Sequence, residues 1–153
     1  MPILHALLLC LHLLAAAFWL GGMATILFAV RPAAIQVLEA PPLRLQMLSA
    51  TLARFFTLVQ VAITVLFATG LLMLILLAGR AHWSAHVMLG LGLLMMGLFA
   101  YVRGRLFPRL QRAVAEQAWP LAGAALNAIR PMVNLNLGLG CLVFVIAVVG
   151  RAF

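Results

Sequence analysis

Four long apolar stretches dominate this sequence, and each is long enough to cross a lipid bilayer. They cover residues 3–30, 55–78, 85–102 and 131–150. A helix needs about 20 apolar residues to cross the roughly 30 Å of bilayer hydrocarbon. Hydrophobic residues make up 67% of the chain and charged residues only 8%, whereas a soluble domain carries about 25% charge. We therefore predict an all-α integral membrane protein, a single domain over residues 1–153 folded as an up-down bundle of four transmembrane helices.

The basic residues, all of them arginine, predict how this bundle is oriented. Four spans place both termini on one side of the membrane, together with Arg80 and Arg151. The other side holds the remaining eight arginines: Arg31, Arg44, Arg54, Arg103, Arg105, Arg109, Arg112 and Arg130. Positive residues collect on the cytoplasmic side of a membrane protein. We therefore predict periplasmic termini in a bacterial inner (cell) membrane, and we interpret the net charge of +8 as a topology signal rather than a nucleic-acid surface.

The most polar part of the chain, residues 103–130, separates the third span from the fourth. Its apolar residues recur with the period of a helix, which predicts an amphipathic cytoplasmic helix between the two spans. We expect breaks at Pro108 and at Trp119–Pro120, because proline disrupts a helix interior. We expect the fourth span to begin at Pro131, with that proline in its first turn.

The first span carries two histidines, which are costly inside a membrane and need a reason. His5, His12 and Trp19 are seven residues apart, and seven steps of about 100° return to nearly the same face of a helix. The next position in this series, Ile26, is apolar. A polar and aromatic face is therefore predicted along the outer half of the first span.

The other two histidines lie at the predicted outer end of the third span. His82 and His86 are four residues apart and share a helix face. All four histidines thus fall in the outer half of the bundle, where Met88 is a soft neighbour and no carboxylate is predicted. Imidazole with thioether sulfur suits Cu(I), whereas hard cations prefer carboxylates. This pattern predicts a copper site built from His5, His12, His82, His86 and Met88.

Two other interpretations of the histidines stay open. A b-type haem would fit between the first and third spans, with His12 and His86 as axial ligands and Arg80 near the propionates. Alternatively the histidines only form hydrogen bonds between helices, and the protein is a metal-free structural or assembly subunit. The two acids, Glu39 and Glu116, lie on the opposite side from the histidines, so the sequence offers no acid–base pair for hydrolysis.

Smaller features have packing interpretations. Gly22, Gly138 and Gly140 are expected to let helices approach one another closely. Asn134 is expected to form an interhelical polar contact with Gln60 and Thr64. The two cysteines, Cys10 and Cys141, both fall inside apolar spans and provide no disulfide framework.

Four motifs, in this order along the chain, resemble the copper-resistance protein D (CopD) superfamily in its short, stand-alone form. They are His12 followed by Trp19-Leu20-Gly21-Gly22, then Arg54-Phe55-Phe56 leading to Thr69-Gly70, then the segment 86–95, and finally 129–138. The resemblance implies a membrane protein that binds or moves copper, with a periplasmic copper protein or redox partner.

A related branch, the HemJ-type protoporphyrinogen oxidases, resembles the same four-helix core. Its helix-1 histidine matches His12, and the resemblance implies haem b as an alternative cofactor. The lysine that this branch uses in its third helix falls near Val87 or Met88, and this chain contains no lysine. That departure argues against the oxidase activity, so an enzyme, if there is one here, would be another haem-dependent oxidoreductase.

Overall fold

The computed structural model describes residues 2–76 and 82–150, and these form four long helical rods with no strand among them. The first rod comprises α1 (Pro2–Thr25), the π-helical segment η1 (Ile26–Val30) and α2 (Arg31–Val37). The second rod is α3 (Pro41–Leu76). The third comprises α4 (Trp83–Tyr101), the π-helical segment η2 (Val102–Leu106) and α5 (Phe107–Ala115), and the fourth is α6 (Trp119–Val149).

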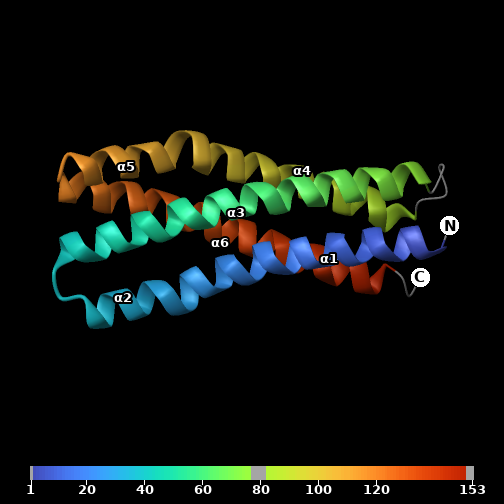
Figure 1. The fold of residues 1–153 in the computed structure, drawn as a ribbon, viewed down its shortest axis with the longest axis horizontal. Helices are drawn as coiled ribbons and strands as arrows, with labels where there is room; N and C mark the ends of the chain where they lie inside the picture. Colours follow the sequence, from blue (N-terminus) through green and yellow to red (C-terminus); the bar gives the residue numbers. More distant parts are fainter. Residues whose placement is uncertain (1, 77–81, 151–153) are drawn as a thin grey trace.

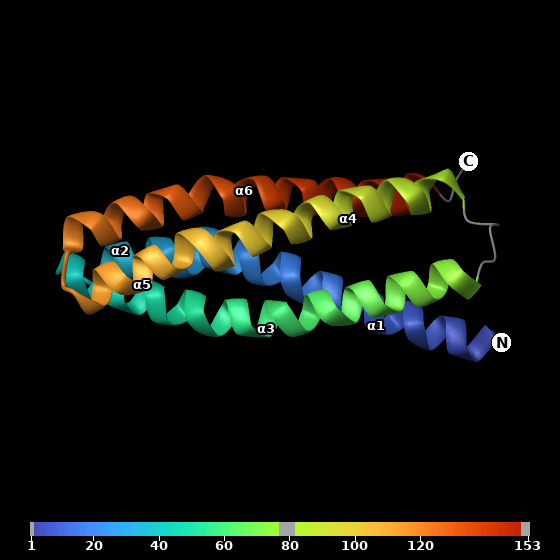
Figure 2. The same cartoon turned by 90° about the horizontal axis from the view of Figure 1, so that it is seen from above.

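The rods run up and down as two neighbouring hairpins, with both ends of the chain at the same end of the bundle (Figures 1 and 2). The first rod packs mainly against α3, and α4 and α5 pack mainly against α6. All four rods are long and apolar enough to cross a membrane, and most of their apolar surface faces outward rather than into the bundle. The prediction of an all-α bundle of four transmembrane helices is confirmed.

The rods are longer than the apolar stretches that predicted them. They cover Ile3–Val37, Pro41–Leu76, Trp83–Ala115 and Trp119–Val149, between 31 and 36 residues each. At 1.5 Å per residue these lengths are about 46–54 Å, well beyond the hydrocarbon thickness. Each rod therefore extends beyond the apolar stretch that predicted it, most of all at the end of the bundle away from the termini.

The polar segment 103–130 is not a separate helix. The third rod stays helical through Pro108 and ends at Ala115, and the chain turns at residues 116–118. The predicted break at Pro108 is wrong because η2 accommodates the proline: the backbone N–H of Phe107 donates to the carbonyl of Val102, five residues back. Such a π-turn shifts the helical frame where a proline lacks its own N–H donor. The same arrangement recurs in η1, just before Pro32.

The fourth rod also begins earlier than predicted. Trp119 and Pro120 open α6, and Pro131 lies inside the helix rather than in its first turn. The apolar face of segment 103–130 is used within the bundle: Phe107, Leu110 and Ala122 are 1%, 0% and 0% exposed. The helical period of this segment is therefore present in the structure, but its apolar face packs against another helix of the same chain.

Two groups of buried residues form the core. One lies towards α5, the first half of α6 and the middle of α3, where Phe56 meets Phe107 edge-on with ring centroids 5.1 Å apart. The other lies further towards the termini and contains Trp19, Met23 and Met95. Trp19, from the face of the first span that carries His5 and His12, therefore points into the core and not into lipid.

Candidate functional site

His12 is the histidine that the fold holds against a neighbouring helix. It lies on α1, is half-buried, and has its Nδ1 atom 2.9 Å from Oγ1 of Thr69 on α3. Thr69 itself is 6% exposed. This contact crosses the interface between the first rod and α3 at a level where both helices are otherwise apolar. An interhelical hydrogen bond in that setting fixes the imidazole ring in one orientation.

The hydrogen bonds of Thr69 determine which ring nitrogen of His12 carries the proton. A threonine hydroxyl has one hydrogen to donate. Oγ1 of Thr69 lies 2.6 Å from the carbonyl oxygen of Val65, one turn back in α3, and donates to it. With the hydroxyl hydrogen assigned to this carbonyl, the shortest of its contacts, the hydroxyl oxygen accepts from Nδ1–H of His12. In the neutral imidazole this leaves the lone pair on Nε2, the arrangement found in histidines that bind a metal ion.

Gly70 gives the His12 ring its place against α3. A Cβ atom at this position would lie 3.1 Å from Cε1 of His12 and 3.6 Å from its Nδ1. The first distance is tighter than an ordinary van der Waals contact, so any side chain here would push the ring outward. Thr69 and Gly70 therefore form a cradle for His12, one by hydrogen bonding and the other by its lack of a side chain.

The remaining predicted ligands are spread over the outer surface. His5, His82 and His86 are exposed, and Met88 is half-buried on α4. His82 lies just before α4, with its Nδ1 3.2 Å from Oγ of Ser84 and its ring centroid 5.6 Å from that of Trp83. Arg80 lies outside the described residues.

The structure does not bring these groups together into one cluster. Within residues 2–76 and 82–150, no three His, Cys, Asp or Glu side chains are placed to hold a metal ion jointly. His12 and His86 lie on rods whose main neighbours are α3 and α6 respectively. The copper site built from all four histidines and Met88, and the pairing of His12 with His86 on a haem, both stay predictions.

A comparison of the sequence with protein-family models identifies the family of this chain. A family model described as copper resistance protein D matches residues 49–150, from the first third of α3 to the residue after α6. The chain belongs to the copper resistance protein D family. No curated protein and no solved structure gives a significant match. Together with the four apolar rods, the family makes this a multi-pass membrane protein.

The family match covers Thr69 and Gly70 but not α1. His12 therefore lies outside the matched segment of this copper resistance protein D family member. It belongs to the candidate site because α1 packs on α3. The sequence pattern singled out His12 but missed its partners. The signal that points to them is the Thr69-Gly70 pair, a hydroxyl next to a missing side chain in an otherwise apolar helix.

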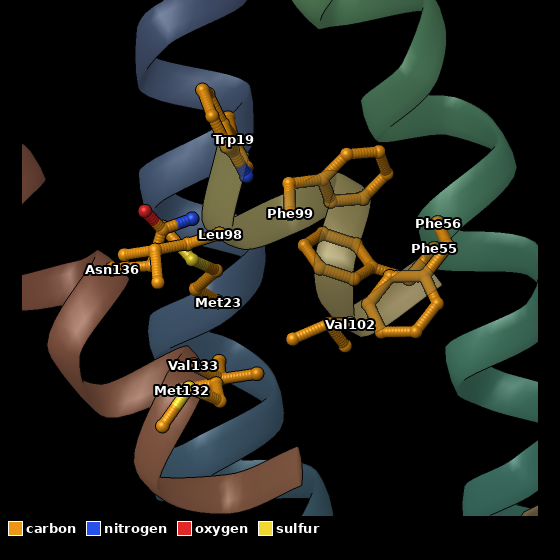
Figure 3. A pocket seen from close by; sticks show the side chains of 10 residues that line it. All are labelled: Trp19, Met23, Phe55, Phe56, Leu98, Phe99, Val102, Met132, Val133 and Asn136. Atoms are coloured by element: carbon orange, nitrogen blue, oxygen red, sulfur yellow. The ribbon is translucent and has the colours of Figure 1, made fainter. Parts of the chain in front are cut away.

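A second feature of the family member is a cavity deeper in the bundle. It lies beside Trp19, the last residue on the polar and aromatic face of α1. Trp19 is 3% exposed and meets Phe99 of α4 edge-on, with ring centroids 6.2 Å apart. Beside them is a small cavity of about 20 Å³, to which α1, α3, α4, η2 and α6 all contribute side chains. Figure 3 shows its ten lining residues, among them Met23, Met132 and Asn136. We call this the central cavity.

The polar contact predicted for Asn134 is not formed. Asn134, Gln60 and Thr64 are all exposed, and the hydroxyl of Thr64 donates to the carbonyl of Gln60 within its own helix, at 3.0 Å. The buried amide is instead Asn136, which is 5% exposed and lines the central cavity. The two asparagines lie about 200° apart around α6, so only one of them can face the core.

Proposed function

We propose that this protein handles copper inside the membrane, and that Nε2 of His12 is a Cu(I) ligand in the half of the bundle nearest the termini. The observation that carries this proposal is the cradle of His12. Thr69 contacts Nδ1 of the ring and Gly70 makes room for the ring. With the proton on Nδ1, the lone pair on Nε2 can bind a metal ion. Membership of the copper resistance protein D family supports copper as the metal.

The position of the acids argues against a hard cation at His12. Glu39 and Glu116, the two acids of the chain, lie at the other end of the bundle, beyond the arginines of α2, α3 and α5. An imidazole nitrogen is a ligand that suits copper, whereas Ca²⁺ and Mg²⁺ need several oxygen ligands. A neutral histidine also spares the protein the cost of holding a fixed charge at this depth.

The exposed histidines have a separate role in the proposal. His5 is near the start of α1, and His82 and His86 are at the start of α4. Both helices start at the end of the bundle that holds the termini (Figure 1). There they receive copper from the aqueous phase, and His12 holds it deeper in the bundle. The distribution of the arginines supports a periplasmic position for this end in a bacterial inner membrane, where a periplasmic copper protein would be the donor or acceptor.

Cu(I) binding to the purified protein tests the proposal. The detergent-solubilised protein is titrated anaerobically with Cu(I) against a chromogenic chelator, and wild type is compared with His12→Ala and with a His5→Ala/His82→Ala/His86→Ala variant. We expect His12→Ala to lose more affinity than the roughly 10–100-fold that removal of a partner of a metal ligand costs. The triple variant should keep the tight site and fill it more slowly.

The same sample separates the proposal from the haem alternative. An absorption spectrum of protein purified from haem-replete cells should show no Soret band. Unchanged Cu(I) affinity in His12→Ala would remove the basis of the proposal, and a Soret band that disappears in the same variant would favour haem instead.

A further inference from the structure

A groove lies between the third rod and α6, at the end of the bundle away from the termini. Its volume is about 540 Å³, within the range of about 300–1,000 Å³ found for pockets that bind organic molecules. The helices that border it, α5 and α6, are antiparallel neighbours joined by the turn at residues 116–118 (Figures 1 and 2). Arg109 and Arg112 line it, and we call it the arginine groove.

Small side chains on α6 leave the arginine groove open. The residues that α6 contributes follow the three- and four-residue spacing of one helix face: Leu121, Ala124, Ala125 and Ala128. Three of the four are alanines, too short to fill the space beside the long arginine side chains. Leu106 and Ala113 of the third rod line the groove as well and are 7% and 6% exposed. The groove therefore has an apolar floor.

The polar and apolar parts of the lining lie at different depths. Leu106 and Ala128 are each ten residues from the turn at 116–118, and Arg109 and Ala125 are each seven residues from it. In an antiparallel hairpin, residues at equal distances from the turn lie at the same level. Apolar residues therefore line the groove at the end nearer the lipid-facing spans, and the charged residues begin closer to the turn. This is the order of parts in a lipid molecule seen from its chains to its headgroup.

The arginines can reach the level of lipid phosphates. Tyr101 on α4 is 51% exposed, and tyrosine is typical of the boundary between membrane and water. Arg109 comes eight residues later, about 12 Å further along the axis. Side chains on a helix lean toward its N-terminus, which for the third rod is the direction of the membrane. The long side chains of Arg109 and Arg112 therefore extend back toward the headgroup layer.

The charges in the groove match a single phosphate group. Arg109 and Arg112 are one helical turn apart, and Glu116 is the third charged residue of the lining. Their sum is +1, which one phosphodiester neutralises. Guanidinium groups bind phosphate oxygens through paired hydrogen bonds. A second phosphate would be repelled by the carboxylate of Glu116, whereas a hydroxyl group would find an acceptor there.

We propose that the arginine groove binds one phosphatidylglycerol molecule, a phospholipid with a single negative charge and hydroxyl groups in its headgroup. Its phosphate binds Arg109 and Arg112, its headgroup hydroxyls lie toward Glu116, and its acyl chains cover the alanines of α6. Basic pockets between transmembrane helices bind lipid headgroups in this way. A free phosphate ion would leave the apolar floor uncovered. The inference does not depend on copper.

Native mass spectrometry tests the site. Delipidated protein in an uncharged detergent is mixed with equal amounts of phosphatidylglycerol and phosphatidylcholine that carry the same acyl chains. Wild type is compared with Arg109→Gln/Arg112→Gln and with the control Arg54→Gln/Arg130→Gln, which removes the same charge at two exposed arginines outside the groove. An arginine near an anionic lipid contributes about fivefold in affinity, so the first variant should lose about 30-fold. The control should retain one phosphatidylglycerol, as wild type should.

A second pair of variants tests the shape of the groove without changing its charge. Ala128→Phe places a large side chain in the apolar end of the groove and should reduce phosphatidylglycerol binding. Ala115→Phe, at an exposed alanine that does not line the groove, should bind as wild type does. Neither glycerol 3-phosphate nor inorganic phosphate at the same concentration should displace the lipid.

Four outcomes would overturn the inference. They are equal retention of both lipids by wild type, equal losses in the two double arginine variants, equal binding in the two phenylalanine variants, and displacement by glycerol 3-phosphate or inorganic phosphate. The third would place the lipid elsewhere on the bundle, and the fourth would make the groove a site for a free anion.

Photocrosslinking of wild type covers the case in which a variant does not fold. A phosphatidylglycerol with a diazirine near the start of one acyl chain is activated by light, and the labelled peptides are mapped by mass spectrometry. Labels should fall within residues 106–116 and 121–128. Labels spread evenly over the outer surfaces of all four rods contradict a specific site.

Discussion

Nδ1 of His12 lies 2.9 Å from Oγ1 of Thr69, and this contact joins residues 57 positions apart in the sequence. We assign the hydroxyl hydrogen of Thr69 to the carbonyl of Val65, its shortest contact, and in this arrangement the imidazole is the donor. Thr69 is not itself a ligand in the proposed site, but its hydroxyl determines which nitrogen of His12 is free. In metalloproteins a carboxylate or a backbone carbonyl usually orients a metal-binding histidine. In the proposed site a hydroxyl orients His12, and it adds no charge.

Thr69→Val should weaken Cu(I) binding by about 10–100-fold, the usual cost of removing the partner that orients a metal-binding histidine. Valine keeps the shape of threonine but neither accepts from Nδ1–H nor fixes the ring. Thr69→Ser keeps the hydroxyl and should bind within a few-fold of wild type. Competition with a Cu(I) chelator measures both affinities, and ¹⁵N NMR of labelled histidine reports the tautomer. Equal affinities in the valine and serine variants would show that the hydrogen bond does not matter for binding.

Gly70→Ala should weaken Cu(I) binding without destabilising the fold. The new Cβ would lie 3.1 Å from Cε1 of His12, so the ring must move by a few tenths of an ångström, and we expect a loss near the lower end of the same range. Gly97→Ala is the control, because its Cβ would meet nothing within 4 Å. Both changes raise helix propensity by about 1 kcal/mol. If the two variants bind Cu(I) equally well, Gly70 has no role in positioning His12.

The number of rods was predictable from the sequence, and their lengths were not. Hydropathy identifies the parts of a helix that face lipid, and it found one such part in each rod. It does not report where a helix continues past the bilayer and buries its apolar face against a neighbour. Leu110 and Ala122, both fully buried, come from such a continuation. Nor does hydropathy show that the π-turn before Pro108 lets the helix continue.

The candidate site was predictable only in part, for a related reason. Helical spacing placed His12 and Trp19 on one face of α1, and that face does point into the bundle. Which helix it meets depends on how four rods pack, and a single sequence does not encode this in any local pattern. The pairing of His12 with α3 through Thr69, and the burial of Asn136 rather than Asn134, are properties of the assembled bundle.

Gly140→Ala should destabilise the protein, whereas Gly138→Ala on the same helix should not. A Cβ at Gly140 would overlap the side chain of Leu20, while one at Gly138 would meet nothing within 4 Å. Overpacking of this kind costs about 1–3 kcal/mol and exceeds the gain in helix propensity. Thermal unfolding in one detergent, followed by circular dichroism, compares the two variants. A Gly140→Ala variant as stable as Gly138→Ala would mean that α1 and α6 separate there at little cost.

Asn136→Leu should stabilise the protein. The change eliminates a buried acceptor whose missing partner costs about 1–3 kcal/mol, and the central cavity beside it gives the larger side chain room. For a chain of this size each kcal/mol corresponds to about 2–4 °C in the unfolding midpoint. Asn134→Leu, an exposed position two residues earlier, should change stability by less than about 0.5 kcal/mol. A gain of this size would show that the unpartnered oxygen of Asn136 lowers the stability of the bundle. A loss of more than about 1 kcal/mol would instead show that the amide oxygen has a partner in the membrane, and that the cavity is occupied by water bound to it.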